Sequence, residues 1–447
     1  MSEICTFPRG VHPPEGKELA AECAVEVLPQ PSQVRIPLLQ HVGAPATSVV
    51  KPRTEVKMGE KVGEAGGMIS AHVHASLSGK VGRSRKVTLP NGRRVPAVEI
   101  AVADEQEVAN DKLWEHIYGG EWPTDVSNYE AQAIVDAVRE AGLVGMGGAA
   151  FPTHVKLMRN PEKPIDTILI NGAECEPYLT ADYRLMLEAP APIVCGALLA
   201  AQATGAKEVR ICIEDNKPQA IAAMQKAVAG THVKVTTLKT KYPQGGEKQL
   251  ILAVTGREVP NGGLPLDVGV VVVNAGTAAA IARAVVRQQP VTHRIVTVSG
   301  EGIQRPANLL VPIGVAIQEL LDYCGGFTSS RVRVIAGGPM MGFAISALDS
   351  PVTKGTSGIT VFTEQQFART PETNCIRCGR CVDVCPMGLV PTRIALAARK
   401  KDAEVAQRYH VNACMECGCC AYVCPASLPL VQLIRLSKIY VRQAQNR

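Results

Sequence analysis

The cysteines of this chain are gathered into one short segment, and their spacing repeats. Nine of the fifteen cysteines lie between residues 375 and 424. Eight of them form two runs of the pattern C-x2-C-x2-C-x3-C-P, 39 residues apart: Cys375, Cys378, Cys381 and Cys385, then Cys414, Cys417, Cys420 and Cys424. Two intervening residues let a turning backbone place successive sulfurs on adjacent corners of a metal cluster, and the proline, which lacks an N–H, ends the turn.

This spacing is typical of bacterial ferredoxins, in which three closely spaced thiolates bind one [4Fe–4S] cube and the fourth binds the cube of the other half. The rule assigns Cys375, Cys378, Cys381 and Cys424 to cluster 1, and Cys414, Cys417, Cys420 and Cys385 to cluster 2. Structural zinc is the alternative, but zinc favours two C-x2-C pairs. The ninth cysteine, Cys419, is expected to pack near a cluster without binding it. Two clusters with crossed ligands lie side by side, which predicts a path for single electrons.

Composition limits the class of protein. The length of 447 residues predicts roughly three domains. Lys and Arg number 47 and Asp and Glu 41, so a net charge of +6, spread thinly over so long a chain, does not favour nucleic acid as the main partner. The small number of aromatic residues, 6 Phe, 9 Tyr and 2 Trp, also disfavours a base-stacking surface. We therefore expect a folded protein that binds no nucleic acid.

The sequence predicts a reducing, cytoplasmic compartment. Residues 1–10 include Glu3 and Arg9 and contain no apolar segment typical of a secretory signal. Clustered cysteines in such a context favour metal binding over disulfides. The longest uncharged stretch, Ala189–Ala206, is interrupted by two prolines and by polar residues, so a buried helix explains it better than a membrane span.

The N-terminal part has the pattern of a β domain. After an arm over residues 1–30, residues 31–104 alternate short Val- and Ile-containing runs with turn residues. Val56–Val62 and His74–Val81 resemble the two half-motifs of the barrel-sandwich fold of biotinyl and lipoyl carrier domains. Those carriers need a lysine at the hairpin tip, and none lies between Lys61 and Lys80, which implies an unmodified copy. His72 and His74 share a strand face, but without a third ligand they are expected to be ordinary surface residues.

The remaining domains follow in order. Residues 128–286 alternate buried strands, at 167–170, 208–213, 232–238 and 268–273, with helices, which predicts an α/β domain with a doubly wound, partly parallel sheet. Residues 290–336 are predicted to form a β-grasp module and residues 337–364 a connector. The cluster segment covers 365–427, and a basic helix covers 428–447. We expect this helix to cap the cluster segment, with docking on a membrane or a partner subunit as the alternative.

Four polar turns in the α/β domain predict a nucleotide site. The glycine-rich stretch Gly142–Lys156 lets backbone N–H groups approach a phosphate, because glycine lacks Cβ. Asn171–Tyr178 follows a predicted strand, and the carboxyl ends of parallel strands are where open α/β sheets bind ligands. Tyr242–Lys248 and Val273–Thr277 add two further polar turns.

Together these turns, within residues 142–285, resemble the flavoprotein subunit that accepts NADH in respiratory complex I. The resemblance implies FMN contacts from Gly145, Gly147, Gly148, Lys156, Asn171, Glu174, Gly246, Glu247, Asn274 and Thr277. It also implies that Phe151 stacks on the nicotinamide nucleotide and that Glu176 accepts a ribose hydroxyl of NADH.

The whole domain order resembles the family of C subunits of Rnf electron transport complexes, including the segments Gly337–Gly342 and Lys354–Gly358. The resemblance implies a ferredoxin:NAD oxidoreductase subunit that moves electrons between NAD(H), FMN and two [4Fe–4S] clusters. It further implies a peripheral position on the cytoplasmic side of the bacterial inner membrane, with ion-pumping partner subunits that include a ferredoxin-like one. The alternatives are an iron–sulfur relay without flavin activity and a soluble cobalamin reductase of the propanediol-utilisation type.

Overall fold

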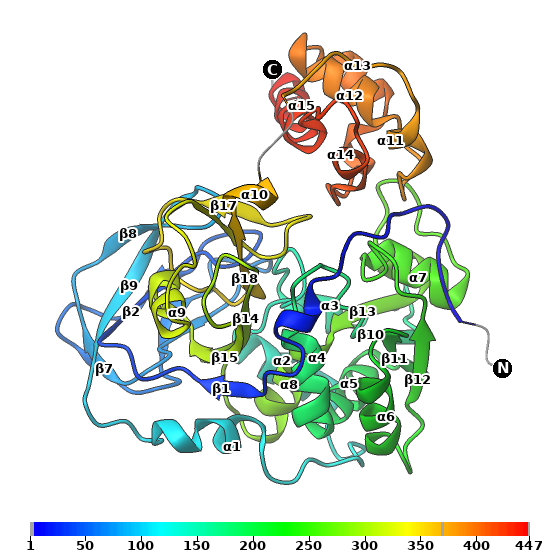
Figure 1. Cartoon of the computed structure of the whole chain (residues 1–447). Helices are drawn as coiled ribbons and strands as arrows, with labels where there is room; N and C mark the ends of the chain where they lie inside the picture. Colours follow the sequence, from blue (N-terminus) through cyan, green and yellow to red (C-terminus); the bar gives the residue numbers. More distant parts are fainter. Residues whose placement is uncertain (1–3, 368–370, 446–447) are drawn as a thin grey trace.

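The computed structural model describes residues 4–367 and 371–445, and Figure 1 shows the chain as a row of modules with the cluster segment at one end. The first three residues of the predicted arm, residues 368–370 of the predicted cluster segment and the last two of the predicted basic helix lie outside the described residues. The mixed α/β and β architecture matches the predicted fold class.

Two small sheets build the N-terminal β domain. One sheet has the order β2-β9-β7-β4, with β8 also paired to β9, and the other has the order β3-β5-β6. The strands are β2 Gln33–Pro37, β3 Thr47–Ser48, β4 Glu55–Val56, β5 Lys61–Glu64, β6 Val73–His74, β7 Gly79–Val81, β8 Arg85–Thr88 and β9 Arg94–Val102. Alternate residues such as Val34, Ile36 and Ile100 point into the core, as the period of a half-buried strand requires. Helix α1, Leu113–Tyr118, leads into the next domain.

His72 and His74 differ from the expectation, because both are buried rather than at the surface. His72 Nδ1 accepts the N–H of Ala65 at 3.1 Å, and burial lowers the pKa of both rings. The hairpin between β5 and β6 folds back on the α/β domain, which covers this strand face and leaves the histidines no solvent.

The α/β domain has a four-stranded parallel sheet in the order β12-β11-β10-β13. The strands are β10 Thr167–Asn171, β11 Glu208–Glu214, β12 Lys234–Leu238 and β13 Val270–Asn274. The helices are α2 Ala131–Glu140, α3 Thr153–Leu157, α4 Ala181–Glu188, α5 Pro190–Thr204, α6 Pro218–Ala227, α7 Glu247–Thr255 and α8 Ala275–Val286. Alternate residues of β10 pack into separate cores on its two faces, one including α5 and α8 and the other α7.

Helix α5 accounts for the long uncharged stretch and is buried against α8, as predicted. Among the described residues, no single helix is long and apolar enough to cross a membrane. Helices α4 and α5, which meet at 98°, together meet the requirements of length and composition.

A six-stranded sheet forms the third module, in the order β1-β15-β14-β18-β16-β17, with α9 Ile317–Tyr323 beside it. The strands are β1 Val25–Val27, β14 His293–Ser299, β15 Ala307–Pro312, β16 Val332–Ala336, β17 Phe343–Ile345 and β18 Gly358–Thr363. The predicted arm therefore supplies β1, and the predicted connector supplies β17 and β18. Strand β18 lies between β14 and β16, so residues 337–364 belong to the sheet itself rather than linking it to the cluster segment.

The cluster segment is helical. Its helices, with the one that leads into it, are α10 Glu364–Phe367, α11 Arg380–Asp383, α12 Pro391–Arg399, α13 Ala403–Arg408, α14 Cys419–Tyr422 and α15 Leu430–Gln445. Helix α15 packs on α12, where Ser437 Oγ donates to the Ile394 carbonyl at 2.9 Å. Lys438 Nζ also donates to the carbonyl of Cys414 at 2.7 Å. The basic helix thus covers the cluster segment, in the manner of a cap.

Candidate flavin and cluster sites

The sheet of the α/β domain reverses its strand order between β10 and β13. Strands β11 and β12 follow on one side of β10, whereas β13 lies on the other. The last residues of the two central strands, Asn171 and Asn274, are partners in register. Open α/β sheets bind ligands at such a switch point, outside the carboxyl ends of the strands. Both asparagines therefore face the expected position of a ligand.

The glycine-rich loop packs onto this switch point. The N–H of Gly145 donates to the Phe151 carbonyl at 2.8 Å, which closes the loop on itself. The N–H of Met146 donates to Thr277 Oγ1 at 2.9 Å, in the first turn of α8. A Cβ on Gly147 would lie 2.8 Å from Nδ2 of Asn274, so a larger residue would push the loop away from the strands.

A chain of hydrogen bonds joins the acidic turn, Asn171–Tyr178, to the switch point. Glu174 accepts the N–H groups of Asp182 at 2.7 Å and Tyr183 at 3.1 Å, at the start of α4. Asp182 Oδ2 in turn accepts from Asn274 Nδ2 at 2.6 Å. Burial, reinforced by the charge of Glu174, raises the pKa of Asp182. Asp182 was not among the predicted site residues, because it lies in a helix outside every sequence motif.

The turn before α7 closes the other side. Asn171 Nδ2 donates to the Gly245 carbonyl at 2.8 Å. Lys156 Nζ lies 2.7 Å from Glu247 Oε1 and 3.2 Å from the Val272 carbonyl. The glycine-rich loop, the acidic turn, the turn before α7 and the start of α8 hold the ten residues predicted to contact FMN. These four segments thus meet at one edge of the sheet.

The donors at this edge fit FMN, which carries an anionic phosphate and a ring rim of alternating donors and acceptors. Gly147 and Gly148 are exposed, and none of the described residues accepts a hydrogen bond from their N–H groups. Lys156 supplies a cation. The amide of Gln244 is fully buried beside Gly245, and neither its oxygen nor its nitrogen has a partner within the described part of the chain. A polar ligand at this edge would relieve that cost.

Glu176 is held by a loop from the β-grasp module. Its carboxylate accepts the N–H groups of Met340 at 3.2 Å and Met341 at 2.8 Å. Burial raises the pKa of Glu176 to about 7, although these two N–H groups and the charge of Lys17 oppose the shift. The segment Gly337–Gly342 therefore lies against a residue expected to bind NADH. Phe151, the other such residue, is half-buried in the glycine-rich loop.

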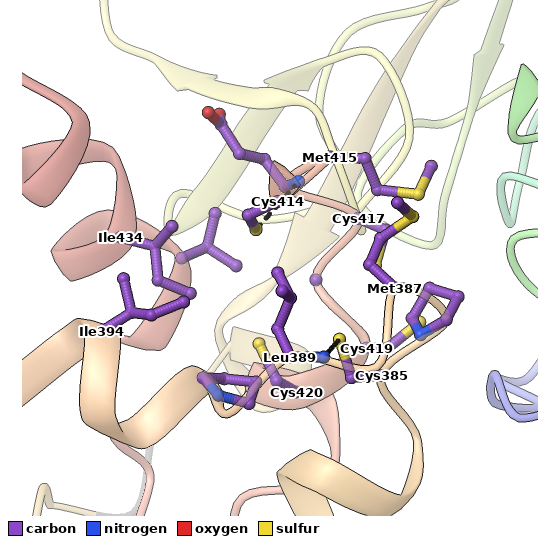
Figure 2. A pocket seen from close by; sticks show the side chains of 15 residues that line it. Cys385, Met387, Leu389, Ile394, Cys414, Met415, Cys417, Cys419, Cys420 and Ile434 are labelled. Carbon is purple, nitrogen blue, oxygen red and sulfur yellow. Dashed lines mark hydrogen bonds between the residues drawn. The ribbon is translucent and has the colours of Figure 1, made fainter. Parts of the chain in front are cut away.

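The four cysteines assigned to cluster 2 border one cavity of about 390 Å³, part of it open to solvent. Figure 2 shows Cys385, from the first run, beside Cys414, Cys417 and Cys420 from the second. Leu389, Ile394 and Ile434 contribute apolar walls (Figure 2). The crosswise choice of ligands thus corresponds to a single enclosure in the fold.

This enclosure suits a cluster better than a single ion. Across residues 4–367 and 371–445, no three His, Cys, Asp or Glu side chains gather closely enough to hold one metal ion. The cysteines are spaced around a volume instead. Burial raises the pKa of Cys414 to about 11 and also raises that of Cys420, so thiolates here need a positively charged partner. Iron at the corners of a cube supplies that charge.

The cysteines assigned to cluster 1 lie near the surface. Cys381 is buried, whereas Cys378 is exposed and Cys375 and Cys424 are intermediate. Burial raises the pKa of Cys381, and the neighbouring Cys424 and Cys378 add to this shift. The first run and the end of the second run are therefore close together, as crossed ligands require.

The flavin turn, Tyr242–Lys248, and the cluster 2 loop, Cys414–Cys420, are in direct contact. The hydroxyl of Tyr242, which is 1% exposed, donates to the Cys417 carbonyl at 2.7 Å. A Cβ on Gly246 would lie 2.9 Å from the terminal carbon of Met415. Cluster 2 is therefore the cluster beside the flavin edge, which the two equal cysteine runs do not reveal.

Four family models match successive parts of the chain. They are the RnfC barrel sandwich hybrid domain at residues 5–106, the Nuo51 FMN-binding domain at 138–283, the SLBB domain at 295–344 and the 4Fe-4S dicluster domain at 374–428. These matches confirm the predicted fold class and the predicted cofactors, FMN and two [4Fe–4S] clusters.

Curated relatives match almost the whole chain. The C subunit of the proton-translocating ferredoxin:NAD(+) oxidoreductase complex of Clostridium ljungdahlii is 44% identical, over 99% of this chain and 95% of the relative. The chain belongs to the family of C subunits of ion-translocating oxidoreductase complexes. The C subunit of the Na(+)-translocating complex of Acetobacterium woodii is 45% identical over 87% of this chain and 86% of the relative. That of the ion-translocating complex of Rhodobacter capsulatus is 43% identical over 98% and 83%.

A solved structure shares the fold at lower identity. The NAD+-reducing [NiFe]-hydrogenase in its H2-reduced state superimposes with a TM-score of 0.51 and 21% identity, over 77% of this chain and 68% of that chain. This likeness extends to the fold and no further.

Proposed function

We propose that this chain is the NAD(H)-reacting electron-transfer subunit of an ion-translocating ferredoxin:NAD oxidoreductase complex. The contact between Tyr242 of the flavin turn and Cys417 of the cluster 2 loop carries the proposal, because it places a two-electron site next to a one-electron site. The relatives named as C subunits of such complexes support it.

The residues divide the work. FMN, when bound, exchanges a hydride with NAD(H) and single electrons with the clusters. Lys156 and the N–H groups of the glycine-rich loop hold the anionic parts of the flavin. Phe151 stacks on the nicotinamide nucleotide, and Glu176 accepts a ribose hydroxyl. Tyr242 fixes the cluster 2 loop against the flavin turn, which keeps the distance for electron transfer short.

Electrons then pass between cluster 2 and cluster 1, and cluster 1 exchanges them with partner subunits, including a ferredoxin-like one. We place this protein peripherally on the cytoplasmic side of the membrane. The match of residues 5–106 to the barrel-sandwich model of this family disfavours the cobalamin reductase alternative. The relay alternative predicts no flavin uptake. Anaerobic reconstitution with FMN, iron and sulfide distinguishes the two: our proposal requires about one bound flavin that bleaches with NADH, and a chain that takes up iron alone would contradict it.

Glu247→Ala is expected to lower flavin occupancy several-fold while leaving iron content intact. Glu247 pairs with Lys156 at 2.7 Å at the start of α7, so its loss frees the lysine at the flavin edge. Flavin and iron measured on the same samples test this. Glu258→Ala, which changes an exposed acid just beyond α7, is the control. Flavin occupancy equal to that of the unchanged chain would remove this turn from the site.

NADH use is expected to improve as the pH rises through 7. The pKa of Glu176 is raised to about 7, so its carboxyl is neutral below that pH and ionised above it. Only the ionised form is a strong acceptor for a ribose hydroxyl. The KM for NADH, measured with an artificial one-electron acceptor, should fall several-fold between about pH 6 and pH 8. Glu176→Gln should abolish this dependence, and an unchanged pH profile in that variant would exclude the proposed role.

A further inference from the structure

The two cysteine loops have the same spacing but opposite surroundings. The cluster 2 loop is covered by Tyr242 and by the β-grasp module, where a Cβ on Gly418 would lie 2.7 Å from the Met340 carbonyl oxygen. In the cluster 1 loop, every residue from Pro371 to Arg380 except Cys375 is exposed. Cluster 1 therefore has an open edge and cluster 2 does not.

The positive charge of the chain is concentrated in this same segment. Residues 371–447 contain 11 Lys and Arg and 5 Asp and Glu, a surplus of six that equals the surplus of the whole chain. Residues 1–370 are therefore neutral overall, and the expectation that the charge is spread thinly is wrong. Four thiolates on a cube are themselves negative, but the arginines project beyond them into solvent.

The open edge carries cations without acidic partners. Arg377 and Arg380 flank the exposed Cys378, and neither forms an ion pair with any described residue. By contrast, Arg399 pairs with Glu372, and Lys438 pairs with Glu416. Unpaired arginines at a surface are the groups that steer an oppositely charged protein.

Large apolar side chains lie at the same edge. Ile376 is 67% exposed and Tyr422 is 49% exposed. The N–H of Thr373 donates to the Ala426 carbonyl at 3.1 Å, which brings the chain near Ile376 alongside the chain near Tyr422. Exposed aliphatic, tyrosine and arginine side chains in one patch are typical of a protein interface.

We propose that Ile376, Arg377, Cys378, Arg380 and Tyr422 form a docking surface for an acidic protein that carries its own one-electron centre. The inference rests on the proposed function, because cluster 1 must exchange electrons outside this chain. One electron passes between the partner's centre and cluster 1, one being oxidised as the other is reduced, and no bond or proton changes. A lipid surface would also attract arginines, but it offers no redox centre opposite the only open cluster edge in the described residues.

The test uses the full chain with FMN and both clusters, and a small acidic two-[4Fe–4S] ferredoxin as the probe. The second-order rate of electron transfer from the reduced probe is measured by stopped flow at several salt concentrations. R377E/R380E should lower this rate at least about tenfold at low salt and flatten its salt dependence. R377Q/R380Q should give an intermediate loss. R93E/R94E, which reverses two exposed arginines of the β8–β9 hairpin, should stay within about twofold of the unchanged chain.

Three readings separate the outcomes. Iron, flavin and NADH-driven flavin bleaching should be equal in all variants, and their failure in the unchanged chain would instead refute the proposed function. Equal rates and equal salt slopes in R377E/R380E and the unchanged chain would overturn the docking surface. Cosedimentation with phosphatidylglycerol vesicles that is lost in R377E/R380E, while transfer from the probe persists, would overturn it in favour of a lipid contact.

Discussion

Cys385→Ala will remove the cluster beside the flavin, although Cys385 belongs to the first cysteine run. It borders the same cavity as Cys414, Cys417 and Cys420, and three ligands do not retain a cube well. Iron should fall from about eight to about four per chain. The remaining cluster should then no longer exchange electrons with the flavin, because cluster 2 lies between them.

Cys424→Ala is the matched partner of that variant. It should also lose about four irons, yet keep the cluster that communicates with the flavin. Cys419→Ala, in the wall of the same cavity, should keep all the iron and serves as the control. Iron analysis and electron paramagnetic resonance of the three variants test the assignment. If Cys424→Ala, and not Cys385→Ala, lost communication with the flavin, the ligands would be uncrossed.

Lys354→Met is expected to destabilise the chain by about 2–5 kcal/mol. Lys354 is 1% exposed, and its Nζ donates to the carbonyls of His72 at 2.8 Å and Gly142 at 2.7 Å. It thereby joins the β domain, the start of the glycine-rich loop and the segment before β18. Methionine fills a similar volume but leaves both buried carbonyls without a donor. Burial lowers the pKa of Lys354 to about 7, and a neutral amine still donates to both carbonyls.

Urea denaturation of Lys354→Met and of Lys51→Met, which changes an exposed lysine, measures this effect. We also expect lower flavin occupancy in Lys354→Met, because Gly142 begins the loop that faces the flavin. A free energy of unfolding within about 0.5 kcal/mol of the unchanged chain would show that Lys354 is not needed at this junction.

Local patterns carried the sequence predictions that succeeded. The strands of the α/β domain are short apolar runs, each followed by its own helix, so the parallel sheet follows from neighbouring segments. The cysteine spacing encodes a loop geometry in the same way. Strand β18 was missed because its neighbours β14 and β16 are distant in sequence and because glycine and serine before it obscure the pattern.

Long-range contacts decide what the sequence did not show. The two cysteine runs are equivalent as patterns, and only the bond from Tyr242 to Cys417 distinguishes the inner cluster from the outer one. Lys354 lies in a segment singled out by resemblance, but its partners His72 and Gly142 come from two other modules. Asp182 is a helix residue whose importance depends entirely on Asn274, 92 positions away.

Both clusters and the flavin can be followed together in one anaerobic sample. NADH is added to the oxidised, fully loaded chain, and NAD+ is added to a dithionite-reduced sample, while flavin absorbance and cluster paramagnetic signals are recorded. We predict that in at least one direction the flavin and both clusters change oxidation state together. A flavin that responds to the nucleotide while both clusters stay unchanged in both directions would contradict a continuous electron path through this chain.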